Sequence, residues 1–153
     1  MNTIQLQQSY KKDRTQGKKY EEKLLETLNE NNNKIKFKAC RDPFHLFDFY
    51  YKSKTTNQSI RIELKSRNIK STQFSTTIVG SNKVDKAYKY YQKNIDVYFM
   101  ISFIDTGVIY LKYNPKLFKK FERKNIYRVD RGISKQHVMI PVKLMKELCE
   151  IKF

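Results

Sequence analysis

The chain has 153 residues, enough for one domain with a buried core, and its contents of 39% hydrophobic and 14% aromatic residues exclude wholesale disorder. Its longest nearly apolar segment, residues 97–104, is far too short to cross a bilayer, which needs roughly 20 residues, and no apolar signal sequence opens the chain. The 32 Lys and Arg against 15 Asp and Glu give a formal net charge of +17. So positive an electrostatic field indicates a polyanionic partner. Nucleic acid is the leading candidate, and an anionic membrane surface is the second. We expect an intracellular protein, in cytoplasm, nucleus or virion.

The hydrophobic pattern predicts elements in the order α-β-β-β-α-β. We expect them at residues 17–30, 34–39, 45–51, 60–67, 81–92 and 96–104. A turn is expected at residues 31–33 and a Ser/Thr-rich loop at 71–80, after which Ser81 can cap the second helix. This order is typical of an α/β fold (an α+β mixed sheet) with helices on the faces of the sheet.

Three regions are expected along the chain. Residues 1–16 form a loose, basic polar arm, residues 17–113 form the core, and residues 114–153 form an extension packed on the same domain. The core closes with a hairpin whose second strand covers residues 108–113. The extension is expected to hold a short basic helix after Pro115, strands near residues 126–129 and 138–140, and a last helix opened by Pro141.

The first helix directs one acidic side chain towards the interior. Leu24, Leu25 and Leu28 form an apolar stripe, and extending this stripe backwards by three or four residues reaches Glu21. Glu22 lies on the opposite face. We therefore expect Glu21 to point inwards and Glu22 to point to water.

Two further acidic residues are expected on the hairpin that the second and third strands form. If its turn centres on Thr55 and Thr56, Asp48 lies opposite Glu63, whereas a shift of one residue places Asp48 opposite Lys65. Either register brings the three side chains within roughly 5 to 8 Å of one another.

Such a group of side chains suits metal-assisted hydrolysis. Neighbouring carboxylates repel each other unless a cation lies between them, and oxygen ligands of this kind favour Mg²⁺. Lys65 projects from the same strand face and can hold a scissile phosphate or help to deprotonate an attacking water. However, Glu-x-Lys occurs four times in the chain. The pattern alone therefore leaves a surface ion pair on a solvated hairpin face equally open.

The order and spacing of these residues along the chain favour a catalytic role over a surface ion pair. Gly17-x-x-x-Glu21 on a first helix, then Asp48, then Glu63-x-Lys65, followed by a basic helix and a hydrophobic strand, resembles the PD-(D/E)XK (restriction-endonuclease-like) nuclease superfamily. Among its branches the layout is most similar to archaeal-type Holliday-junction resolvases and similar small endonucleases. The resemblance implies an αβββαβ core with C-terminal additions. It also implies that Asp48, Glu63 and Glu21 bind Mg²⁺, with Mn²⁺ as a substitute, and that Lys65 acts on the nucleophilic water.

The resemblance covers about residues 17–104 and includes two departures from the family pattern. Phe47 replaces the proline usually found before the aspartate. The RecB-like exonuclease branch carries Gln-x-x-x-Tyr on its second helix, where this chain has Lys86 to Tyr90. This second departure argues against a processive exonuclease.

Basic and hydroxyl side chains beside this site are expected to contact nucleic acid. The second helix should turn Val84, Ala87, Tyr88 and Tyr91 inwards. Its opposite face should then present Lys83, Lys86, Tyr90 and Lys93 to nucleic acid. The segment after the third strand should supply Arg67, Lys70 and Thr72. The alternative for the helix is a solvated basic face.

Together these features predict a Mg²⁺-dependent DNA endonuclease, acting on branched or otherwise structured DNA and encoded by a virus, a phage or a low-GC microbe. A non-catalytic nucleic-acid-binding or packaging protein on the same fold is the alternative, and no residue separates DNA from RNA. Symmetric cutting of two strands favours a homodimer, paired through the last helix. No membrane partner and no small-molecule cofactor are expected.

Overall fold

The computed structural model describes residues 3–30, 34–42, 45–129 and 132–153, so the turn expected at residues 31–33 lies outside it. Its helices and strands follow the expected order, with additions. They are α1 (Thr3–Glu30), β1 (Lys38–Ala39), β2 (Phe49–Lys52), β3 (Ser59–Ser66), β4 (Thr76–Gly80), α2 (Ser81–Tyr91), β5 (Asp96–Phe103), β6 (Gly107–Lys112), α3 (Pro115–Phe118), β7 (Arg123–Arg128), β8 (Ile133–Pro141) and β9 (Lys146–Glu147). No helix in the described ranges is long and apolar enough to span a membrane.

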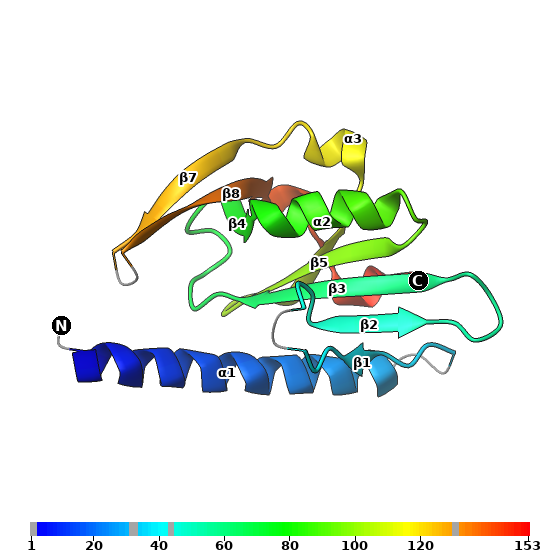
Figure 1. The fold of residues 1–153 in the computed structure, drawn as a ribbon, viewed down its shortest axis with the longest axis horizontal. Helices are drawn as coiled ribbons and strands as arrows, with labels where there is room; N and C mark the ends of the chain where they lie inside the picture. Colours follow the sequence, from blue (N-terminus) through cyan, green and yellow to red (C-terminus); the bar gives the residue numbers. More distant parts are fainter. Residues whose placement is uncertain (1–2, 31–33, 43–44, 130–131) are drawn as a thin grey trace.

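The strands form two sheets (Figure 1). The larger has the order β1-β2-β3-β5-β6-β9, in which β3 and β5 run parallel and the other neighbours antiparallel. The smaller has the order β4-β8-β7 and is antiparallel. The predicted mixed sheet with an αβββαβ core and C-terminal additions is confirmed.

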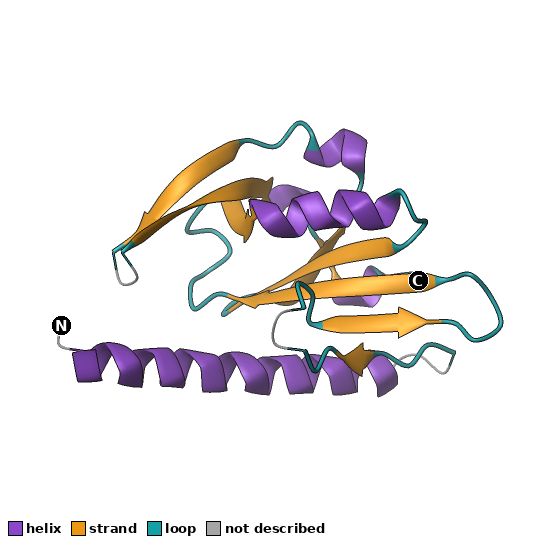
Figure 2. Ribbon diagram, in the orientation of Figure 1, coloured by secondary structure: helices purple, strands orange, loops and turns teal. Residues whose placement is uncertain are grey.

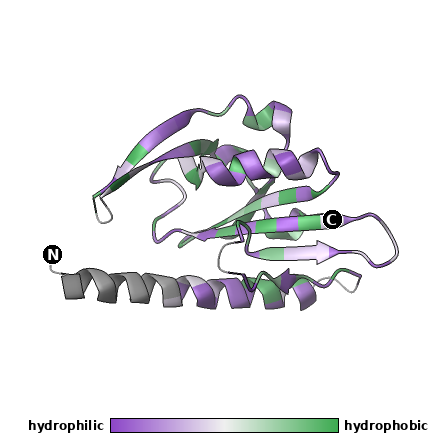
Figure 3. Cartoon of the chain, viewed as in Figure 1, coloured by the Kyte–Doolittle hydropathy of each residue, from purple (hydrophilic) through white to green (hydrophobic). Residues whose placement is uncertain are grey.

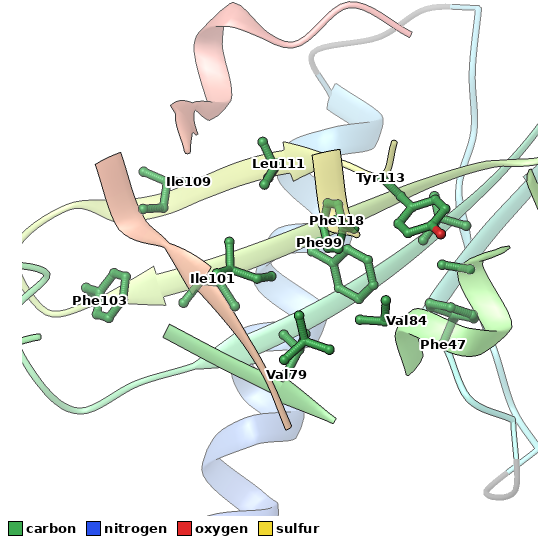
Figure 4. Packing of buried hydrophobic residues seen from close by; sticks show 14 residues of the cluster. Phe47, Val79, Val84, Phe99, Ile101, Phe103, Ile109, Leu111, Tyr113 and Phe118 are labelled. Atoms are coloured by element: carbon green, nitrogen blue, oxygen red, sulfur yellow. The ribbon is translucent and has the colours of Figure 1, made fainter. Parts of the chain in front are cut away.

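Helices cover both faces of the larger sheet, α1 on one and α2 on the other (Figure 2). Strand β5 is therefore buried on both sides, as its unbroken apolar sequence predicts. Phe99 and Ile101 pack with Val84 of α2 in the cluster that Figure 4 shows. Tyr98 and Met100 point the other way, into a second cluster with Leu24 and Leu28 of α1.

The expectation of a loose arm at residues 1–16 is wrong, because α1 already begins at Thr3. Gln, Leu, Lys and Arg, which are good helix formers, dominate residues 4–16, and one internal glycine, Gly17, costs only about 1 kcal/mol. Without a proline, nothing in this segment stops the helix. The division into a core and an extension at residue 113 stays a prediction.

Other expected elements are shorter or different. The strand expected at residues 34–39 is reduced to β1, because the Asn29 side-chain amide binds both the backbone N–H and the carbonyl of Phe37. The loop expected at residues 71–80 contains β4, and Ser81 is the first helical residue after the cap at Gly80. The last helix is absent: residues 142–150 form two short 3-10 turns, Val142–Leu144 and Leu148–Glu150, on either side of β9.

The face that α2 turns inwards also differs from the expectation. Val84 and Ala87 are buried as expected, but Tyr88 and Tyr91 are half exposed. Tyr90 packs on the core instead, with its ring centroid 5.6 Å from that of Phe47. Tyrosine carries a polar hydroxyl, so it tolerates water where a purely apolar side chain would not.

Candidate active site

The hairpin of β2 and β3 positions the first carboxylate. Phe49 pairs with Ile62, which is the register of the first of the two predicted arrangements, and Asp48 lies one residue before β2. The backbone N–H of Asp48 donates to the carbonyl of Ile62 at 2.9 Å. The backbone N–H of Leu64 donates to Asp48 Oδ2 at 2.7 Å, which fixes the carboxylate beside β3.

The second carboxylate, Glu63, lies in the protein interior with only 1% of its surface exposed. Two ammonium groups hold it: Lys65 Nζ lies 3.1 Å from Oε1, and Lys83 Nζ lies 3.2 Å from Oε2. The Lys65 side chain remains 40% exposed. Burial of Glu63 rules out the alternative of a surface ion pair on a solvated hairpin face.

Lys83 was expected on the solvent-facing side of α2, and this expectation is wrong. Its Nζ also donates a hydrogen bond to the carbonyl of Leu46 in the segment before β2. Lys83 thus links α2, the buried Glu63 and the chain that leads to Asp48. Its position one turn before the buried Ala87, at the edge of the apolar face, was the sequence signal for this role.

Helix α1 supplies the third carboxylate. Glu21 is partly buried and lies near the carboxyl group of Asp48, while Glu22 is exposed, as the helical stripe predicts. Glu21 and Asp48 are close enough for each to affect the pKa of the other. The three acids therefore form one cluster with Lys65 and Lys83.

Burial dominates the electrostatics of this cluster. It raises the pKa of Glu63 to about 7, an effect that neighbouring Asp48 reinforces and the two lysines oppose. It also raises the pKa of Asp48, with a further contribution from Glu21, and that of Glu21 itself. Ionising all three acids together is therefore unfavourable unless another cation joins them.

A cleft of about 400 Å³ opens beside the cluster. Glu21 and Lys65 line it, together with Arg67 just after β3 and Arg128 at the end of β7. Because β3 and β5 are parallel, their carboxyl ends meet at the same edge of the sheet, and residues after both strands also line the cleft. The cleft gives an extended ligand access to Glu21 and Lys65.

Comparison with known proteins identifies the family. A family model described as "Phage putative PDDEXK endonuclease" matches residues 8–148. The chain belongs to this family. The predicted PD-(D/E)XK resemblance is confirmed, and nucleases of this superfamily generally use divalent metal ions.

The fold of this PD-(D/E)XK family member is also similar to a solved structure. That protein is Hjc of Archaeoglobus fulgidus, a Holliday junction resolvase from an archaeal hyperthermophile. The two share 14% sequence identity with a TM-score of 0.58, over 88% of this chain and 93% of Hjc. Among proteins with curated functions, no sequence matches the chain.

The donor atoms of the site suit a hard divalent cation. Among the described residues, no donor makes a well-directed hydrogen bond to the buried Oε1 of Glu63, although the Lys65 ammonium lies nearby. Burial and mutual repulsion raise the pKa values of Glu21, Asp48 and Glu63, and a cation bound among them would relieve the repulsion. No three His, Cys, Asp or Glu side chains of the described ranges already stand at metal-binding geometry. Mg²⁺ needs only one or two carboxylates, because water and substrate phosphate complete its ligand set.

The raised pKa of Glu63 predicts that the metal-free protein loses stability as the pH rises from about 4.5 to about 7. In this interval the unfolded chain has released the proton that the folded chain still holds, so rising pH favours unfolding. The shift corresponds to about 3 kcal/mol. Urea unfolding in EDTA across this range measures it.

Variants isolate the contribution of Glu63. Glu63→Gln should show a flatter pH profile than the wild type, because the amide does not titrate. Glu22→Gln, which alters an exposed residue one position from Glu21, should keep the wild-type profile. Parallel profiles for the wild type and Glu63→Gln would contradict the burial argument.

The structure brings only some of the predicted nucleic-acid-binding residues to the cleft. Arg67 lines it, with one guanidinium nitrogen donating to the carbonyl of Ile78 at 2.6 Å. Lys70, Thr72 and Lys93 are exposed, away from the cleft lining. On α2, Lys86 Nζ lies 5.2 Å from the ring centroid of Tyr90. Arg128 was not predicted, and its charge alone did not distinguish it from the other basic residues.

Proposed function

We propose that this family member is a Mg²⁺-dependent endonuclease that hydrolyses phosphodiester bonds in branched or otherwise structured DNA. One observation carries the proposal: Glu63 is buried beside Asp48 and held at 3.1 Å by Lys65, which lines an open cleft together with Glu21. A protein that only bound DNA would gain nothing from burying an acid there, because the carboxylate repels phosphate and its burial destabilises the fold.

In this proposal Asp48, Glu63 and Glu21 hold the metal ion. When bound, Mg²⁺ lowers the pKa of a coordinated water and offsets charge on the phosphate. The Leu64 N–H orients Asp48, and Lys83 neutralises the inner oxygen of Glu63, so that its other oxygen faces Lys65. The half-exposed Lys65 ammonium then holds a phosphate oxygen or assists removal of the proton from the attacking water.

Charge and fold support DNA as the substrate. The net charge of +17 favours a polyanion, and the fold similarity to a Holliday junction resolvase favours a branched one. Arg67 within the cleft, and Lys70, Thr72, Lys86 and Lys93 outside it, are the proposed phosphate contacts, with Tyr90 supporting Lys86. Symmetric cutting further suggests a homodimer, although the helix expected to pair the subunits is absent.

Incubation with labelled DNA tests the proposal. The substrates are a linear duplex, a nicked duplex and a four-way junction, with a matched RNA, each in Mg²⁺, in Mn²⁺ and in EDTA. We expect cutting of DNA in both metals, fastest on the branched substrate, and none in EDTA. Binding without cutting in every condition would instead support the non-catalytic alternative, and cutting of RNA alone would overturn the choice of substrate.

A further inference from the structure

The hairpin formed by β7 and β8 projects beyond the body of the protein. Residues 137–141 of β8 pair with β4, whereas in the described ranges residues 133–136 pair with β7 alone. Ile126 is the only residue of β7 that is not classed as exposed. In Figure 1 the hairpin extends towards the same side of the molecule as the N-terminal half of α1. The core does not require this projection, which suggests a binding role.

The hairpin meets the candidate active site through Arg128. Its side chain lines the cleft that Glu21 and Lys65 also line. Arg67 lines the same cleft, and its guanidinium lies near enough to Arg128 for the two charges to repel each other. Burial and this repulsion lower the pKa of Arg67. An anion in the cleft would relieve the repulsion, and a phosphate bound to both guanidiniums supplies the matching charge.

The strands of the hairpin complement a nucleic-acid backbone. They carry Arg123, Lys124, Arg128 and Lys135, and neither β7 nor β8 contains an acidic residue. Arg123 is paired with Asp85 of α2 at 2.9 Å, which fixes the base of the hairpin. The remaining basic side chains extend from that base towards the outer end, where a phosphate backbone leaving the cleft would pass.

The outer end of the hairpin exposes apolar side chains among these charges. Tyr127 is 61% exposed, Val129 85% and Ile133 49%. Tyr127 and Ile133 lie on opposite faces of the hairpin, because Ile133 pairs with Arg128, the neighbour of Tyr127. Figure 3 shows hydrophilic and hydrophobic segments alternating along the hairpin. Exposed apolar groups flanked by arginines and lysines suit DNA whose bases are unstacked, since aromatic and aliphatic side chains pack on an open base face. A continuous duplex offers no such face without being kinked.

We propose that the outer end of the β7–β8 hairpin binds the DNA beside the cleft as a wedge, with Tyr127 and Ile133 on its two faces, and Val129 at its turn, packed against unstacked bases. It thereby selects DNA interrupted by unpaired nucleotides over continuous duplex. This inference rests on the proposed function only in placing DNA in the cleft. It assigns a role to the C-terminal part of the chain, which the sequence did not explain, and to three side chains that neither the core nor the acidic cluster uses.

Binding measured in EDTA tests the proposal without any need for cleavage. The two probes are a labelled continuous duplex and the same duplex with a short central bulge that contains 2-aminopurine. The wild type should bind the bulged DNA more tightly and change the 2-aminopurine fluorescence. Tyr127→Ser/Ile133→Ser should lose about 5- to 150-fold in affinity for the bulged DNA, the range for stacking one base on a side chain. Its affinity for the duplex should stay within about twofold of the wild type.

Tyr88→Ser is the matched control, because Tyr88 is an exposed tyrosine on α2, near the base of the hairpin and not at its outer end. It should leave both affinities unchanged. Arg128→Ala should weaken binding to both probes and lower the salt slope of binding by about 0.9, the value for one phosphate contact. Thermal unfolding of every variant should match that of the wild type, because all the changed side chains are at the surface.

The outcomes separate this inference from the endonuclease proposal. Equal affinities of the wild type for both probes, an unchanged 2-aminopurine signal, or equal losses on both probes in the double variant would each overturn the hairpin inference, whether or not the protein cuts DNA. Selective loss on bulged DNA by a protein that cuts nothing would support the hairpin inference and refute the endonuclease.

Discussion

Replacing Asp48 by asparagine is expected to lower the rate of metal-dependent cleavage by about 10²- to 10³-fold or more, while affinity for DNA in EDTA stays unchanged or improves. The fold should tolerate the change, because the asparagine amide oxygen still accepts the Leu64 N–H. The substitution removes one negative charge from the place where a phosphate must bind, so the affinity for DNA without metal increases. Single-turnover cleavage and binding in EDTA give the two readouts.

Lys65→Ala should stop cleavage as well but change binding in the opposite direction, because it removes a positive charge from the cleft. Opposite effects on binding with the same loss of activity distinguish a metal-carboxylate-lysine site from general damage to the fold. Asp96→Asn serves as the control, since Asp96 pairs with Lys112 at the surface, at the other end of β5. Cleavage by Asp48→Asn at the wild-type rate would place the active site elsewhere.

Affinity for DNA is expected to fall steeply with salt. A protein that neutralises about six to ten phosphates loses on the order of 10³ to 10⁵ in affinity between about 50 and 200 mM salt, and the net charge of +17 supplies enough cations. Fluorescence anisotropy titrations over this range measure the slope. Affinity that barely changes with salt would refute a polyanionic partner.

The structure also predicts which lysines determine this slope. Lys86→Ala/Lys93→Ala should lower it by about 1.8, the value for two phosphate contacts. Lys83→Ala should leave it nearly unchanged, because the Lys83 ammonium is already bound to Glu63 and to the Leu46 carbonyl. If Lys83→Ala lowered the slope as much as the double variant, the assignment of Lys83 to the acidic cluster would be contradicted.

Local patterns were sufficient to predict the central part of the fold. The unbroken apolar sequence of β5 predicts burial on both faces, and the alternation in β3 predicts one fully apolar face. The register of the β2–β3 hairpin followed from the position of its turn. These features involve neighbours in sequence or in one hairpin, so few alternatives had to be weighed.

Long-range contacts determine what the sequence did not predict. The direction of the Lys83 side chain depends on the Leu46 carbonyl and on Glu63, which reach α2 only in the folded protein. Strand β4 forms because residues 76–80 find a partner in β8, more than fifty residues later in the chain. Arg128 likewise enters the cleft through the path of the whole hairpin. No periodicity within a short window contains this information.

The pairing of Phe49 with Ile62 has a consequence for how such sites vary among proteins. The chemistry requires that Asp48 and Glu63 meet across two strands, but it sets no length for the turn at residues 53–58. A pair of residues inserted there would leave the strands aligned, whereas a one-residue slip of a strand would turn its acid to the opposite face of the sheet. The distance in sequence between the two acids can therefore drift while their distance in space does not. Proteins with equivalent sites can thus have few positions in common.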